Sequence, residues 1–76
     1  MKRINLFDAI ELKKAIKSQF DIDLHFHDSC AGQYFELEAT NDLITEFLSN
    51  YFLEKNIAVI FNNDKNMFTL ENMRQS

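Results

Sequence analysis

The sequence predicts an α+β fold in which two helices cover one face of a four-stranded antiparallel sheet, in the order αββαββ. Apolar residues recur at helical spacing in two segments, and each of these is followed by two short segments rich in strand-forming residues. The chain has no proline and only one glycine, so its elements follow one another closely. These observations indicate a two-layer sandwich.

The first helix is predicted over about residues 9–20. Asp8 is the expected N-cap, and Glu11 three residues later completes a capping box. Phe7 before the cap and Leu12 inside the helix are placed for a hydrophobic staple. A stripe of apolar side chains at helical spacing forms the expected buried face: Ala9, Leu12, Ile16 and Phe20.

Two alternating segments predict a hairpin after this helix. Residues 22–27 and 34–38 alternate apolar and polar side chains, which is typical of strands with one buried face. Residues 28–33 between them form the turn, with Gly32 expected to adopt positive φ. Matching the apolar faces places Phe26 opposite Phe35, Leu24 opposite Leu37, His25 opposite Glu36 and His27 opposite Tyr34. Alternation over residues 4–7 is compatible with a further short strand.

The second half repeats this order. Thr40 or Asn41 is the expected cap of a helix over about residues 42–55. The strand at 57–61 is apolar on both faces, which indicates an inner strand or one covered by a partner. A last strand is expected over 67–71.

We expect one domain over residues 1–76. Its two halves, 5–38 and 41–71, share their element order and the pattern Phe-x-Leu-Glu at 35–38 and 68–71. Duplication of one unit and convergence on a simple pattern both explain this likeness.

Charge and composition narrow the function classes. The net charge is −4, but residues 1–17 carry five basic and two acidic side chains, whereas residues 18–76 carry three basic and ten acidic ones. The acidic residues over 18–76 argue against nucleic-acid binding, because their negative charge repels a phosphate backbone. One glycine cannot build a phosphate-cradling loop. No signal segment or apolar run of ~20 residues is present, so we expect a cytoplasmic protein without membrane association.

The small core favours self-association. A domain of this size usually has only about 3–5 kcal/mol of stability, and a single cysteine excludes an internal disulfide. Together with the doubly apolar third strand and the uneven charge, this predicts a non-catalytic binding module that pairs with itself, as a homodimer, or with another protein. The expected partner surface is the open sheet face or an edge strand.

Residues 25–33 hold both histidines, the only cysteine and the only glycine. His25 and His27 point to the same side of a strand, with Cys30 in the turn and Glu36 across from His25. These residue types suit zinc, which is the only cofactor that the sequence indicates, although their spacing is not a recognised zinc signature. The alternative is a pair of exposed sheet histidines, one of them paired with Glu36.

The same segment permits two further interpretations. Cys30, His27 and Asp28 have the composition of a thiol nucleophile with a base and an orienting carboxylate. In the other interpretation Asp28, Cys30 and Gln33 are structural, and the side chains of Asp28, Ser29 and Gln33 hydrogen-bond to the backbone and hold the loop. The candidate binding motif around the turn comprises Asp28, Cys30, Gly32, Gln33, Tyr34 and Glu36.

The turn resembles the signature of a family of small, uncharacterised bacterial proteins known by an Arg-Asp-Ala-Cys motif followed by Gly, Gln and Phe. Asp28, Cys30, Gln33 and Phe35 match that signature. His27 and Ser29 replace the arginine and alanine, and the glycine lies one position later. The resemblance covers about nine residues and implies no activity.

Overall fold

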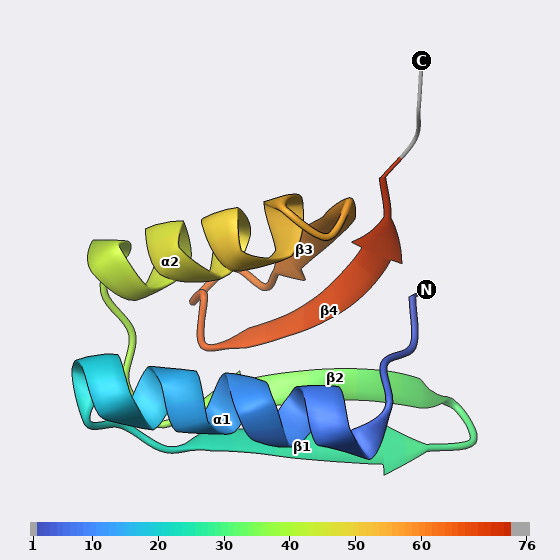
Figure 1. The fold of residues 1–76 in the computed structure, drawn as a ribbon, viewed down its shortest axis with the longest axis horizontal. Coiled ribbons are helices and arrows are strands. Elements are labelled where there is room, and N and C mark those ends of the chain that lie inside the picture. Colours follow the sequence, from blue (N-terminus) through green and yellow to red (C-terminus); the bar gives the residue numbers. More distant parts are fainter. Residues whose placement is uncertain (1, 74–76) are drawn as a thin grey trace.

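The computed structural model describes residues 2–73 and confirms the α+β fold (Figure 1). Both helices lie over the same face of one four-stranded antiparallel sheet, whose strand order is β1-β2-β4-β3. The elements are α1 (Leu6–Phe20), β1 (Leu24–Ser29), β2 (Gly32–Leu37), α2 (Asp42–Leu53), β3 (Ile57–Phe61) and β4 (Met67–Asn72).

The start of α1 differs from the prediction. The helix begins at Leu6, and its N-cap is Asn5, whose side chain accepts a hydrogen bond from the backbone N–H of Asp8. Asp8 therefore lies in the first helical turn, where its negative charge suits the helix dipole. The predicted staple is wrong, because Phe7 is 79% exposed. The short strand over 4–7 is wrong as well, because two of these residues are already helical.

The predicted hairpin register is confirmed at each of the four pairs. Leu24 lies opposite Leu37 and Phe26 opposite Phe35, so both apolar pairs face the helices. Gly32 has φ 146°, a backbone conformation that disfavours a Cβ atom. Asn41 is confirmed as the cap of α2, since its side chain accepts from the N–H of Ile44 at 2.9 Å.

The strand β3 does not lie inside the sheet. It pairs with β4 alone and forms one edge, while β1 forms the other. Of the two predicted alternatives, the inner strand is therefore wrong, and a strand covered by a partner stays a prediction. The second strand of each half, β2 and β4, lies at the centre of the sheet. An apolar strand at an exposed edge is unusual, since native edges normally carry charges or proline.

The two halves meet at a pair of phenylalanines. Phe35 of β2 lies directly opposite Phe68 of β4, and their rings stack with centroids 4.8 Å apart. These residues are also the first positions of the two Phe-x-Leu-Glu segments. Both side chains are 1% exposed. Around them packs a core that both helices and all four strands supply: Ala9, Leu12, Ile16, Leu24, Leu37, Ile44, Leu48, Phe52, Ile57 and Leu70.

We predict that Phe68→Ala removes the folded state at 25 °C. Truncating a buried phenylalanine costs about 3–5 kcal/mol, which equals the whole stability expected of so small a core. Far-UV circular dichroism and urea titration measure the loss. Phe7→Ala is the matched control, because its exposed ring predicts a change within about 0.5 kcal/mol. Equal effects of the two substitutions would contradict the central role of the ring pair.

Candidate functional site

The end of the β1–β2 hairpin holds the N-terminal segment of the chain. The predicted turn over residues 28–33 is too long, because β1 continues to Ser29 and β2 begins at Gly32. The Gln33 side chain is buried, and its Oε1 accepts from the backbone N–H of Ile4 at 2.9 Å. Its Nε2 donates to the Ile4 carbonyl at 3.0 Å. One side-chain amide thus pairs with both polar groups of a single residue, as a neighbouring strand would.

This arrangement exists because β2 and β4 separate beyond the phenylalanine pair. The β2–β4 register contains Phe35 opposite Phe68 and Glu36 opposite Met67. Farther along β4, the carbonyl of Leu70 accepts from the backbone N–H of Lys2 at 2.7 Å. Residues 2–4 therefore lie between the two central strands, as Figure 1 shows for the blue N-terminal segment. Gln33 supplies the contact on the β2 side.

Arg3 extends this contact to the tip of the β1–β2 hairpin. Its guanidinium lies 3.1 Å from Asp28 Oδ1 and donates to the carbonyl of Ser29 at 3.0 Å. A longer bond of 3.5 Å reaches the carbonyl of Cys30. The side chains of Arg3 and Asp28 are about half exposed, so the ion pair itself contributes only about 0–1 kcal/mol. Its geometry fixes the course of the N-terminal segment.

The histidines lie on the open face of the sheet, away from the helices. His25 Nε2 lies 2.9 Å from Glu38 Oε1, and His27 Nε2 lies 3.4 Å from Glu36 Oε1. The second contact lacks the angles of a hydrogen bond, which leaves His27 Nε2 buried without one. The His27 ring stacks on Tyr34, with centroids 4.4 Å apart and planes 11° apart.

The structure does not gather His25, His27 and Cys30 into a ligand set. Across residues 2–73, no three His, Cys, Asp or Glu side chains are grouped so that they could hold a metal ion. Cys30 is exposed at the hairpin tip, between Ser29 and the start of β2. The candidate motif is thus divided: Asp28 and Gln33 bind the N-terminal segment, whereas Tyr34 and Glu36 contact His27.

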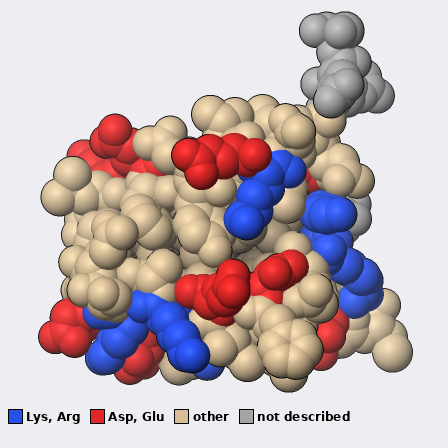
Figure 2. All heavy atoms as spheres, viewed as in Figure 1, with Lys and Arg blue, Asp and Glu red and all other residues tan. Residues whose placement is uncertain are grey.

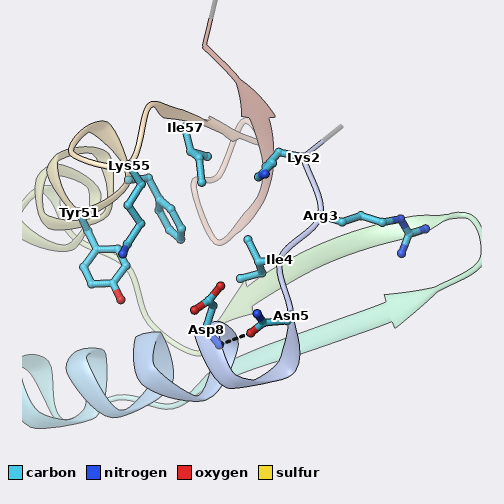
Figure 3. Close-up of a pocket in the computed structure, with 9 residues that line it drawn as sticks. Lys2, Arg3, Ile4, Asn5, Asp8, Tyr51, Lys55 and Ile57 are labelled. Carbon is cyan, nitrogen blue, oxygen red and sulfur yellow. Dashed lines mark hydrogen bonds between the residues drawn. The ribbon is translucent and has the colours of Figure 1, made fainter.

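A pocket of about 350 Å³ lies between the N-terminal segment and the end of α2 (Figure 3). Lys2, Asp8, Tyr51 and Lys55 line it, and Arg3 points away from it toward the hairpin tip. Lys55 Nζ lies 5.4 Å from the centre of the Tyr51 ring. This mixture of charges could hold a small polar molecule. Sequence reasoning missed the pocket because its lining comes from separate elements that no local pattern connects.

The open face also carries a shallow apolar depression of about 260 Å³. Tyr34 and Ile60, which are 37% and 51% exposed, contribute to its lining together with Met67 and Thr69. A depression of this kind can accept an apolar side chain of a partner.

The chain matches no family model, and comparisons with curated proteins and with solved structures likewise found no match. The local resemblance to the family with the Arg-Asp-Ala-Cys motif therefore stays a prediction.

We predict that Gln33→Glu destabilises the protein by about 1–3 kcal/mol, because a carboxylate accepts from Ile4 but cannot donate to its carbonyl. Urea denaturation measures the loss, and amide hydrogen exchange locates it at residues 2–4. Acidification should restore part of the stability, since a protonated carboxyl regains a donor. Gln19→Glu on the exposed side of α1 is the control. An unchanged free energy of unfolding for Gln33→Glu would contradict this role.

Proposed function

We propose that this protein is a small, non-catalytic interaction module of the bacterial cytoplasm that forms a homodimer through β3. The observation that carries the proposal is the free, wholly apolar edge of that strand. The sequence of β3 is Ile-Ala-Val-Ile-Phe, with no charged residue and no proline to discourage pairing.

The hydrogen bonds of β3 define which backbone groups are available. The N–H of Asn62 donates to the carbonyl of Met67, and the N–H of Met73 donates to the carbonyl of Asn56. Antiparallel ladders alternate between paired and unpaired positions, so Ala58 and Ile60 direct their backbone groups toward β4. Ile57, Val59 and Phe61 direct theirs toward the open edge.

These three outward positions are self-complementary. An antiparallel pairing of two β3 strands about a two-fold axis at Val59 places Ile57 of one copy opposite Phe61 of the other. Every outward N–H and C=O of the three residues then has a partner. The two sheets become one continuous sheet, and Ile60 of each copy, 51% exposed in the single chain, gains neighbours on the open face.

Charge supports a protein partner over nucleic acid. The net charge of −4 would repel a phosphate backbone, whereas β3 contributes no charge to oppose its own pairing. Neither helix within residues 2–73 has the length and apolar character needed to cross a membrane. The assignments to the cytoplasm and to bacteria derive from the composition and from the turn resemblance.

A zinc or reactive-thiol site at His25, His27 and Cys30 is the alternative proposal, and zinc is its only cofactor. The exposure of Cys30 supports access of a reagent to the thiol. Glu38 weighs against the alternative, because its Oε1 lies within hydrogen-bond distance of His25 Nε2, at 2.9 Å.

A zinc titration followed by histidine-ring NMR tests this alternative, with Cys30→Ser as the matched variant. Under the homodimer proposal we expect no stoichiometric zinc binding, and we expect Cys30 in the folded protein to react with a thiol reagent no faster than in urea. Sub-micromolar zinc binding that Cys30→Ser abolishes would favour the alternative. So would a Cys30 thiol that reacts with the reagent faster in the folded protein than in the unfolded chain.

We predict that the protein is a dimer in sedimentation and light scattering at high micromolar concentration, and that Val59→Pro and Ile60→Lys each make it a monomer. Proline at 59 removes an outward N–H and leaves the β3–β4 ladder intact. Lysine at 60 lies opposite Ala58 of the other copy and diagonal to that copy's own lysine, so pairing brings two like charges onto one face. Far-UV circular dichroism should show that both variants remain folded.

Two controls separate edge pairing from general destabilisation. Ala58→Pro removes an N–H that points toward β4, so this variant should unfold. Leu43→Lys changes an exposed residue of α2 and should leave the dimer intact. A wild-type protein that is monomeric at high micromolar concentration would show that the homodimer proposal is wrong.

A further inference from the structure

A groove between α1 and the edge strand β1 forms a second candidate interaction surface. It has a volume of about 320 Å³, and its lining includes Ile10, Lys13, Lys14 and Lys17 on α1 and Leu24 on β1. Ile10 lies three and four positions before Lys13 and Lys14, and Lys17 lies four and three positions after them, so the four residues share one flank of the helix. Leu6 extends this flank toward the N-terminus and is 63% exposed.

Beside the groove, β1 has backbone groups that do not pair with β2. The N–H of Glu38 donates to the carbonyl of Asp23, which sets the alternation of the β1–β2 ladder. His25 and His27 therefore direct their backbone groups toward β2, whereas Leu24 and Phe26 direct theirs away from it. The outward groups lie along the edge that the groove follows, since Leu24 belongs to both.

The charges of the groove are only partly balanced. Lys17 lies 3.4 Å from Asp21 and 3.5 Å from Asp23, and these carboxylates raise its pKa, Asp23 most strongly. Lys13 and Lys14 form no ion pair within the described part of the chain. Figure 2 shows basic side chains gathered over the C-terminal half of α1, on the side of β1. An occupant of this end of the groove should therefore be acidic.

The apolar end of the groove determines which other side chains the bound segment should carry. The chain reverses direction between α1 and β1, so the Leu6 and Ile10 end of the helix lies toward the end of β1 and the lysines lie toward its start. A strand that follows β1 would meet the lysines beside Leu24 and apolar side chains farther along. Strand addition of this kind takes affinity from the backbone and selectivity from side chains.

We propose that the α1–β1 groove binds an extended segment of another protein, acidic at one end and apolar at the other, as an added strand along β1. Leu24 and Phe26 pair with its backbone, and Lys13 and Lys14 attract its carboxylates. The inference deepens the proposed binding role by naming a partner, but it does not rest on the β3 dimer. The two surfaces lie at opposite edges of the sheet, so either proposal can fail alone.

The test uses the ¹⁵N-labelled 76-residue chain and the acetylated, amidated peptide Glu-Thr-Glu-Thr-Val-Thr-Val-Thr, whose odd-numbered side chains, first acidic and then apolar, share one face of the strand. We expect saturable amide shifts centred on residues 24–28 and slower hydrogen exchange of the Leu24 and Phe26 amides in the complex. A peptide with lysines in place of the glutamates should not bind. The double substitution Lys13→Glu and Lys14→Glu should raise the Kd roughly tenfold or more, because it reverses two charges at the rim.

The matched control is Lys55→Glu with Lys65→Glu, which changes the net charge equally but away from the groove. It should leave the Kd within about twofold, since distant exposed charges are screened at 0.15 M salt. A version of the glutamate peptide with N-methyl groups on alternate amides, placed to face β1, should lose binding.

Four results would overturn the inference. These are equal binding of the lysine peptide, shifts confined to β3 or the open face, equal weakening by both lysine pairs, and an unaffected N-methyl peptide. Binding to anionic phosphatidylserine vesicles with no response to the glutamate peptide would assign the lysines to a membrane and would also overturn it. Self-association that Lys13→Glu with Lys14→Glu abolishes, without peptide binding, would assign the groove to a second copy.

Discussion

The contact between β2 and β4 is the interaction on which the rest of the structure depends. Each hairpin buries only one face under its own helix, and the two halves become one core where Phe35 stacks on Phe68. Beyond that pair the central strands separate, and the N-terminal segment fills the opening through Lys2 and Ile4. A chain with so few buried residues depends on this junction, because neither half has enough apolar surface to fold alone.

This constraint explains which residues stand at the end of the β1–β2 hairpin. Gln33 follows the same alternation as Phe35 and would face the core as an orphan polar group if Ile4 did not pair with it. Asp28 accepts Arg3 at the hairpin tip, where both side chains remain partly solvated. The part of the turn that most suggested chemistry thus contributes to assembly of the fold, while the histidines belong to the opposite face and pair with glutamates across the strands.

The two edges of the sheet differ in a way that separates their partners. β3 has no charged side chain and carries apolar residues on both faces, so it is complementary to itself. β1 lies beside the lysines of α1, which make that edge complementary to carboxylates. The uneven charge along the sequence becomes, in the folded chain, a basic flank at one edge of a mostly acidic molecule. One small domain can therefore present a self-pairing edge and a partner-binding edge without competition between them.

Local patterns in the sequence determined the order of the elements, the register of the first hairpin and the buried stripe of α1, because these depend on side-chain periodicity and turn residues over short spans. The sequence predicts Asp8 as the N-cap of α1, but several residues near it can cap a helix. The structure uses Asn5, and this choice depends on where Ile4 is held. Only the tertiary structure decided that β4 lies inside and β3 outside, since an apolar run fits either place. The roles of Gln33 and Arg3 were also hidden, because they arise from contacts across 29 and 25 positions of sequence, where no periodic pattern operates.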